Sequence, residues 1–344
     1  MTNHLLDVQD LHVSFDTHAG EVQAVRGVSF WLDAGETLSI VGESGCGKTI
    51  QTIMKLLPSP PSQIKSGAIT YQGTDITHLS DKAMESYRGK EFSMIFQDSM
   101  TSLNPTMRVG RQMCEGILRH QRVSRQEAQQ ISAELLGQVG LPNPELVAKR
   151  YPHTMSGGQR QRVMIAMAMA CNPKILFADE PTTALDVTMQ AQILDLMNHL
   201  KEKRGTSILL ITHDLGVVAK MADRIAVMYA GKIVEYGDAR QVFYRPSHPY
   251  TWGLLGAMPN LIQDVKSELY AIPGTPPDLY APPKGCAFAA RCPYAMEACL
   301  KEDPPEFACG QGHGSRCWLL DPRAPDVTPP EGIPPLPKGG SDHV

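Results

Sequence analysis

Short apolar segments along the chain alternate with segments of helical periodicity. Residues 37–41, 175–178 and 207–212 are largely apolar runs of strand length, which predict buried strands. Residues 187–204 instead place apolar side chains three and four positions apart, as on one face of a helix. Strands that alternate with helices in this way predict a mostly parallel sheet covered by helices, so the expected fold class is α/β.

Two parts of the chain depart from this alternation. The N-terminal part contains short β-type runs, among them 11–15 and 28–32, separated by glycines. From about residue 98 to 158 the pattern becomes helical, and Ser124 with Glu127 three positions later has the form of a capping box. We expect this helical segment to be an insertion into the α/β core.

The chain changes character again at about residue 256, where proline, glycine and cysteine become frequent and periodicity weakens. Five of the eight cysteines fall in this part: Cys286, Cys292, Cys299, Cys309 and Cys317. In a reducing compartment, such clustering favours a metal site over disulfides. Residues 321–344 are rich in proline, and we expect them to be disordered.

The composition is that of a globular protein, with 42% hydrophobic and 20% charged residues among 344. Thirty-two basic and 36 acidic residues give a formal charge of −4, which supplies no broad basic field for nucleic acid. The longest strictly apolar run, residues 163–171, is far shorter than the ~20 residues that span a bilayer. The N-terminus lacks the pattern of a secretory signal. We therefore expect a cytoplasmic protein with no membrane span and no nucleic-acid partner.

Residues 42–49 match the phosphate-binding loop G-x-x-x-x-G-K-[ST] and lie between a predicted strand and a predicted helix. The predicted nucleotide-binding residues here are Gly42, Glu43, Ser44, Gly45, Cys46, Gly47, Lys48 and Thr49. The glycines allow backbone N–H groups to surround phosphate oxygens. Lys48 is expected to reach the β- and γ-phosphates, and the Thr49 hydroxyl to bind Mg²⁺. The motif therefore predicts a site for a nucleotide with Mg²⁺.

Two acidic residues, Asp179 and Glu180, directly follow the apolar run 175–178. Asp179 suits the ligand shell of Mg²⁺, and Glu180 could polarise an attacking water. Taken alone, the pair would also fit a buried strand that ends in a solvated acidic turn. The phosphate loop upstream favours the catalytic interpretation.

Residues 155–159, with the sequence MSGGQ, precede a helical run. Together with the two motifs above, they resemble the ATP-binding cassette (ABC) ATPases, whose signature LSGGQ differs only in its first residue. Other motifs of that family are present in the expected order along the chain: Gln97 before the signature, and the D-loop at 181–186 and His213 after it. The resemblance implies a RecA-like parallel sheet core, an N-terminal antiparallel β subdomain and an inserted helical subdomain at about 98–165. It also implies that the chain hydrolyses ATP.

The resemblance implies that two cassettes pair head to tail, with each ATP between the phosphate loop of one and the signature of the other. The signature residues that would act on the ATP of the partner are Ser156, Gly157, Gly158 and Gln159. Ser156 would bind the γ-phosphate, and Asp186 would couple the two sites.

Within one cassette, the resemblance gives roles to several other residues. Glu180 would be the general base and His213 a switch that responds to the γ-phosphate. Gln97 would sense Mg²⁺ and the water and would touch the membrane subunit. Asp179 would complete the Mg²⁺ ligands, and Phe15 would stack on adenine.

Longer segments, including 94–105 and 179–188, are similar to peptide-importer ATPases. The similarity covers nearly the whole chain and points to the D-type ATPase subunit of oligopeptide and dipeptide permeases. It implies an ABC ATPase domain at 5–255, a permease-type Cys-rich region at 256–320 and a tail at 321–344. Because relatives import nickel chelates or other small solutes, the cargo stays open between peptides and another solute.

The same resemblance implies a [4Fe–4S] cluster held by Cys286, Cys292, Cys299 and Cys317, with Cys309 as the spare. Four soft thiolates and the proline after Cys292 suit iron–sulfur chemistry. The spacing is not C-x2-C, however. By itself it does not separate iron–sulfur from zinc, or from four buried cysteines without a metal.

A transporter ATPase without a membrane span needs partners. The resemblance implies two transmembrane permease subunits and an F-type ATPase subunit as the second cassette, with an extracytoplasmic peptide-binding protein acting indirectly. The chain would lie peripherally on the cytoplasmic face of the inner (plasma) membrane. An ABC ATPase of DNA repair is a distant alternative, but the sequence has no sustained heptads, basic stripe or C-x2-C module. A translation-associated ABC protein would carry two cassettes, whereas one phosphate loop is present.

Overall fold

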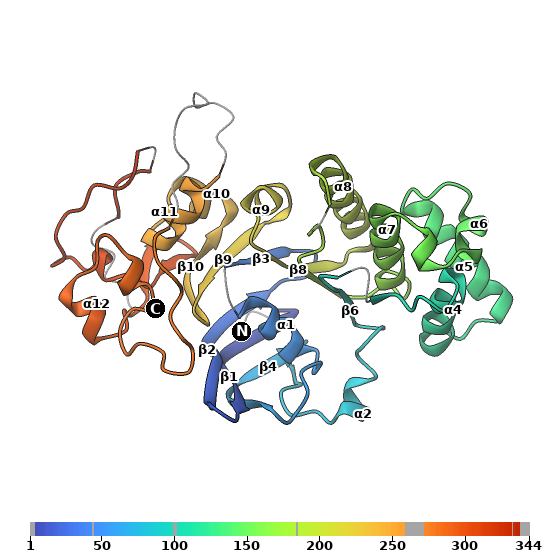
Figure 1. The fold of residues 1–344 in the computed structure, drawn as a ribbon, viewed down its shortest axis with the longest axis horizontal. Helices are drawn as coiled ribbons and strands as arrows, with labels where there is room; N and C mark the ends of the chain where they lie inside the picture. Colours follow the sequence, from blue (N-terminus) through green and yellow to red (C-terminus); the bar gives the residue numbers. More distant parts are fainter. Residues whose placement is uncertain are drawn as a thin grey trace. The chain divides into compact units, whose positions relative to one another are not determined.

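The computed structural model describes residues 4–42, 45–98, 102–183, 185–258, 272–331 and 333–337. The chain divides into two compact units, whose elements are labelled in Figure 1. The first unit comprises Met1–Trp31, Leu38–Thr77 and Thr212–Val344. The second comprises Leu32–Thr37 and His78–Ile211.

An antiparallel sheet forms the N-terminal part of the first unit (Figure 1). Its strands, in sheet order, are β2 (Gly20–Leu32), β1 (Leu6–Thr17), β4 (Ser62–Tyr71) and β5 (Thr74–Asp75). β1 pairs with β4 from Leu6 opposite Tyr71 to Phe15 opposite Ser62, with register shifts on either side of His12. The separate β-type runs of the sequence are thus parts of two long strands, because cross-strand hydrogen bonds carry the pairing through the polar positions between them.

The first unit also contains strands of a second sheet, in the order β11-β12-β10-β9-β3. Their bounds are β3 (Thr37–Val41), β9 (Arg224–Tyr229), β10 (Lys232–Asp238), β11 (Phe307–Gly310) and β12 (His313–Ser315). β3 is parallel to β9, and the remaining neighbours are antiparallel. β3 is buried over its whole length, as predicted for residues 37–41. The Cys-rich part of the chain therefore adds two strands, β11 and β12, to this sheet.

Short helices complete the first unit: α1 (Cys46–Ile53), α9 (Leu215–Met221), α10 (Ala239–Tyr244), α11 (Pro249–Gly256) and α12 (Glu297–Lys301). α1 begins at Cys46, within the phosphate-loop motif, because Gly45 takes a φ of 90° and turns the loop directly into the helix. Single 3-10 turns lie at Pro152–Thr154 in the second unit and at Ala289–Arg291 and Trp318–Leu320 in the first.

Parallel strands form the centre of the second unit, in the order β8 (Ser207–Thr212), β7 (Ile175–Asp179) and β6 (Phe92–Ile95). The short helix α2 (Asp81–Met84) precedes β6, and α8 (Val187–Arg204) connects β7 to β8. The apolar side chains expected to face inward on α8 are all buried: Ile193, Leu194, Met197 and Leu200. The predicted alternation of strands and helices is confirmed here.

The predicted helical insertion is also present in the second unit. Its helices are α4 (Val109–His120), α5 (Arg125–Gln138), α6 (Pro144–Lys149) and α7 (Gly157–Ala168). The capping box at α5 is formed as predicted: Glu127 N donates to Ser124 Oγ at 3.2 Å, and Ser124 N donates to Glu127 Oε2 at 2.7 Å. α4, α5 and α6 pack against one another (Figure 1).

Glu235 of β10 joins the sheet to the C-terminal region. The side chain is fully buried, and its Oε1 accepts a hydrogen bond from Ser247 N at 2.6 Å and lies 2.9 Å from His313 Nε2. Oε2 accepts from His248 N at 3.0 Å and from Thr251 Oγ1 at 2.6 Å. Because a buried carboxylate is tolerated only when it is satisfied, these contacts fix β12 and the start of α11 against β10.

The described part of the Pro-rich tail, residues 321–331 and 333–337, contains no helix or strand. Among the residues that the structure describes, no helix is both long and apolar enough to cross a membrane.

Candidate nucleotide site

The phosphate loop connects β3 to α1 in the first unit. Gly45 has a left-handed φ of 90°, and a Cβ there would lie 2.7 Å from the backbone oxygen of Ala24. A Cβ at Gly42 would lie 1.9 Å from the backbone oxygen of Met228. Both positions therefore require glycine. The predicted residues Glu43 and Ser44 lie outside the described residues.

The remaining loop residues are positioned by the first turn of α1. Cys46 is buried, with its Sγ 3.9 Å from the carbonyl oxygen of Gly42, so its thiol packs into the protein. Gly47 is in the first turn of the helix, and Thr49 is fully buried, with its hydroxyl 3.5 Å from the carbonyl oxygen of Gly45. The helix thus directs its N-terminal N–H groups toward the loop, as anion binding requires.

Phe15 of β1 lies beside the loop. The Nζ of Lys48 is 5.6 Å from the centre of the Phe15 ring and 3.5 Å from Gln51 Oε1. The structure therefore brings the predicted adenine-stacking ring and the predicted phosphate-binding lysine together within the first unit. His213 also belongs to this unit, in the exposed turn between β8 and α9.

The acidic pair lies at the end of β7 in the second unit. Asp179 is the last residue of the strand and is almost fully buried. Glu180 follows with a φ of 47°, which is unusual for a residue other than glycine and marks local strain. Its backbone N–H donates to Ile211 O at 2.8 Å. The strand therefore ends abruptly at Glu180.

Two side chains hold the carboxylate of Glu180. Gln97 Nε2 and Thr183 Oγ1 both donate to Glu180 Oε2, at 2.8 Å and 2.9 Å. Gln97 and Glu180 are both candidate residues from the sequence, lie 83 residues apart in the chain, and are in contact in the structure. Thr183 is not among the candidates, although a hydroxyl three residues after an acid is a recurrent local hydrogen-bond partner.

The signature MSGGQ surrounds the start of α7. Ser156 caps this helix in a capping box: Gln159 N donates to Ser156 Oγ at 3.3 Å, and Ser156 N donates to Gln159 Oε1 at 3.2 Å. A Cβ at Gly158 would lie 2.1 Å from Met189 Cε, whereas one at Gly157 would meet nothing within 4 Å. A side chain at Gly158 would displace the end of the Met189 side chain, whereas one at Gly157 would extend into open space.

The D-loop residue Asp186 caps α8. Its Oδ1 accepts a hydrogen bond from Met189 N at 2.9 Å, and Met189 is the residue that packs on Gly158. The buried Gln161 of α7 also donates from Nε2 to the Pro181 carbonyl. The signature helix and the D-loop are therefore joined through Gln161 and Met189, a connection that no sequence motif predicts.

The prediction of a [4Fe–4S] cluster is wrong. Among the described residues, no group of three or more His, Cys, Asp or Glu side chains is placed so that it could hold a metal ion. Cys286 and Cys292 pack against an apolar cluster that contains Tyr229 and Phe288, and Cys317 packs with Leu319 and Leu320. Cys299 accepts a hydrogen bond from Met296 N at 3.4 Å.

Burial disfavours the thiolate form at three of these cysteines. It raises the pKa of Cys286 to about 11, that of Cys292 to about 12 and that of Cys317 well above its usual value. Cys286, Cys292 and Cys317 therefore contribute to the packing of the C-terminal region as small apolar groups.

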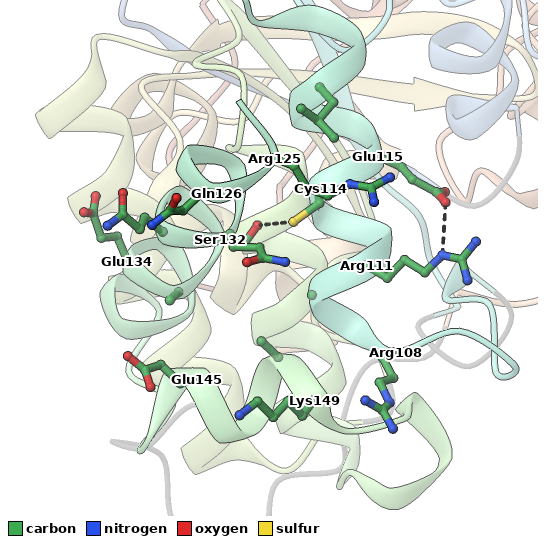
Figure 2. Close-up of a pocket in the computed structure, with 16 residues that line it drawn as sticks. Arg108, Arg111, Cys114, Glu115, Arg125, Gln126, Ser132, Glu134, Glu145 and Lys149 are labelled. Atoms are coloured by element: carbon green, nitrogen blue, oxygen red, sulfur yellow. Dashed lines mark hydrogen bonds and ion pairs between the residues drawn. The ribbon is translucent and has the colours of Figure 1, made fainter. Parts of the chain in front are cut away.

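A groove of about 1120 Å³ lies in the second unit, formed by α4, α5 and α6. Figure 2 shows the side chains that line it. Small buried side chains lie at its base, where Cys114 Sγ is 3.5 Å from Ser132 Oγ. Charged residues surround it, including Arg111 and Glu115, which form an ion pair at 3.5 Å. None of the predicted nucleotide-site residues lines this groove, so it is separate from the candidate catalytic residues.

Similarity to known proteins identifies the family of this chain. Residues 25–183 match the family described as ABC transporter. Residues 234–299 match the family described as oligopeptide/dipeptide transporter, C-terminal region. The chain belongs to the ATP-binding proteins of the ABC transporter family, in its oligopeptide/dipeptide group.

Individual relatives agree with this assignment. The chain is 58% identical to the oligopeptide transport ATP-binding protein OppD of Bacillus subtilis over 96% of this chain and 92% of that one. It is 54% identical to the dipeptide transport ATP-binding protein DppD of the same organism, over 93% and 96%. A solved dimeric ATP-binding cassette, MJ0796 bound to ADP and Pi, superimposes with a TM-score of 0.61 at 26% identity, covering 68% of this chain and 99% of that one. The predicted family and fold are confirmed.

Proposed function

We propose that this chain is the ATP-hydrolysing subunit of an ABC importer for oligopeptides or dipeptides. The observation that carries the catalytic part is the carboxylate of Glu180, which Gln97 and Thr183 hold directly beyond a strand that ends in Asp179. Similarity to peptide-transport ATP-binding proteins over nearly the whole chain supports the peptide cargo.

In this proposal, Glu180 takes a proton from the water that attacks the γ-phosphate of ATP. The two hydrogen bonds at its Oε2 fix the direction of the carboxylate, and the φ of 47° turns the backbone away from the strand at this point. Gln97 orients Glu180 directly, and His213 responds to the γ-phosphate. An oriented base needs little reorganisation when the water attacks.

The other proposed ligands bind the nucleotide and its metal ion. Lys48 and the backbone N–H groups of 42–49 bind the phosphates, and Phe15 stacks on adenine. The Mg²⁺ ligands are Thr49, Gln97 and Asp179, whose oxygen atoms are the hard donors that Mg²⁺ takes. Mg²⁺ held by these residues would neutralise negative charge on the phosphates.

We also propose that a second cassette, an F-type ATPase subunit, completes the site across the signature. Three features support a partner at this surface: the capping Ser156, the open surroundings of Gly157, and the apolar Val187 with 83% of its side chain exposed. The N-terminus of a helix binds phosphate well, which suits the γ-phosphate role of Ser156. A homodimer of this chain is the alternative to that heterodimer, and a measurement of which chains associate would distinguish the two.

The membrane partners of the proposed importer are two permease subunits, and the chain lies peripherally on the cytoplasmic face of the membrane. An extracytoplasmic peptide-binding protein delivers the cargo without touching this chain. The residues of the candidate site are proposed to bind nucleotide and not cargo. They therefore do not distinguish peptides from the alternative cargo, which is nickel or another small solute.

The catalytic assignment is tested by measuring ATP hydrolysis and ATP binding on the assembled importer. We expect Glu180→Gln to keep ATP binding and to lower hydrolysis at least a hundredfold, because the amide cannot accept the proton of the water. Lys48→Ala is the matched comparison and should weaken ATP binding itself. Hydrolysis by Glu180→Gln near the native rate would remove the assignment of Glu180 as the base.

A further inference from the structure

A segment of the C-terminal region, residues 278–284, runs beside the β1–β2 hairpin in the first unit. Gln23 N of β2 donates to Leu279 O at 3.0 Å, and the guanidinium of Arg26 donates to Pro283 O at 3.4 Å. The segment is therefore anchored to β2 at two points, on either side of Tyr280.

Tyr280 reaches from this segment to the end of β1. Its backbone N–H donates to Asp278 Oδ1 at 2.9 Å, and its hydroxyl lies 3.2 Å from Thr17 Oγ1. Thr17 Oγ1 donates its one proton to Gly20 O at 2.8 Å, so the Tyr280 hydroxyl is the donor to Thr17. Ring atom Cδ1 of Tyr280 would be 3.7 Å from a Cβ at Gly20, so the ring lies over the turn of the hairpin.

The position of Thr17 relates Tyr280 to the nucleotide site. Phe15 and Thr17 are two residues apart on β1, so their side chains leave the same face of the strand, about 7 Å apart. This is the face on which Phe15 approaches Lys48 of the phosphate loop. Tyr280 therefore meets β1 on the nucleotide face, beyond Phe15 along the strand.

We propose that Tyr280 is a further nucleotide-binding residue, and that its ring forms, with Phe15, an aromatic wall for the purine base. This inference rests on the proposed function, because it needs ATP bound at the loop 42–49. The hydroxyl is used by Thr17, which holds the ring in place, while 45% of the residue stays exposed and available to a ligand. An aromatic ring that stacks on a base increases the affinity for the nucleotide and requires no hydrogen bonds to the base.

The test compares the dissociation constants of ATP and of inorganic tripolyphosphate for the full chain, measured by equilibrium dialysis. Tripolyphosphate has the phosphates of ATP but no base. We expect Tyr280→Ala to weaken ATP binding about tenfold and to leave tripolyphosphate binding unchanged, since only the base loses a contact. Tyr280→Phe keeps the ring and should weaken ATP binding less than threefold.

Tyr244→Ala is the matched control, because Tyr244 is an exposed tyrosine of the same unit, at the end of α10. It should bind both compounds as the native chain does. If Tyr280→Ala does not fold, Tyr280→Leu keeps the apolar bulk without the aromatic ring and gives the same comparison.

Either of two results would overturn the proposal: native ATP affinity in Tyr280→Ala, or an equal loss of affinity for ATP and tripolyphosphate, which would show a general effect on the loop. Failure of the proposed function looks different. In that case the native chain would bind neither compound, or Lys48→Ala would bind both as the native chain does.

Discussion

At the scale of single residues, hydrogen bonds and close backbone contacts position the residues of the candidate site. Glu180 adopts a strained backbone conformation and is oriented by Gln97 and Thr183. Gly45 lies too close to the backbone oxygen of Ala24 for any side chain to be accepted. Strain and close approach of this kind cost free energy and persist where the surrounding structure enforces them. They coincide here with the residues proposed to act on ATP.

His248 gives a prediction about stability at the same scale. Burial lowers the pKa of its imidazole to about 3, whereas an unfolded histidine titrates near pH 6.5. The unfolded chain therefore binds more protons between these two values. The stability contributed by the neutral ring is present above pH 6.5 and is lost as the pH falls toward 3.

We expect His248→Asn to reduce the loss of stability with falling pH by up to about 1.4 kcal/mol per pH unit between pH 6 and 4. The Asn side chain can still accept the hydrogen bond from Tyr250 N that His248 Nδ1 accepts at 3.0 Å. Urea unfolding at a series of pH values measures this slope, with His18→Asn, an exposed histidine, as the control. A slope that equals that of the native chain would contradict the prediction.

Secondary-structure elements connect the parts of the site. α7 and α8 are joined by the packing of Gly158 on Met189 and by the hydrogen bond from Gln161 to Pro181, so the signature helix is in direct contact with the D-loop and α8 within the second unit. In the first unit, β10, α11 and β12 meet at the buried carboxylate of Glu235. Each connection joins residues that are far apart in the chain.

Removal of the Glu235 carboxylate should therefore detach the C-terminal region from the sheet. We expect Glu235→Ala to lower the free energy of unfolding of the first unit by about 3–5 kcal/mol, because Ser247, His248, Thr251 and His313 lose their buried acceptor. Guanidinium unfolding measures the change, and Glu297→Ala, which removes an exposed carboxylate of the same region, should be nearly neutral. A change below 1 kcal/mol for Glu235→Ala would show that the network does not stabilise the region.

At the scale of the whole molecule, the peptide cargo of the proposed importer can be tested in cells. We expect deletion of the gene to abolish uptake of a labelled tripeptide in cells without a redundant importer, and unlabelled longer peptides to compete with that uptake. The deletion strain carrying Glu180→Gln in place of the native chain is the matched control and should also fail to take up peptide. Unchanged peptide uptake in the deletion strain would indicate that the cargo is nickel or another solute.

The iron–sulfur prediction shows where spacing along the chain fails as evidence. Four cysteines within 32 positions satisfy the count of ligands that a cluster needs. Whether thiols can ionise depends on their surroundings, and here burial raises the pKa of Cys292 to about 12. Sequence spacing contains no information on that burial, so it could not distinguish ligands from packed side chains.

The sequence by itself determined the class of the protein and the strands and helices of the α/β core, and it predicted most residues of the candidate site. These depend on local patterns, such as glycines before a helix or an apolar run before two acids, and local patterns are visible in one dimension. Tertiary structure alone decided which distant groups meet: Gln97 with Glu180, Glu235 with His313, and Tyr280 with Thr17. It also decided that Cys286, Cys292 and Cys317 pack among apolar side chains. The physical reason is that burial and hydrogen-bond partners arise from packing between segments far apart in the chain, and no single segment specifies them.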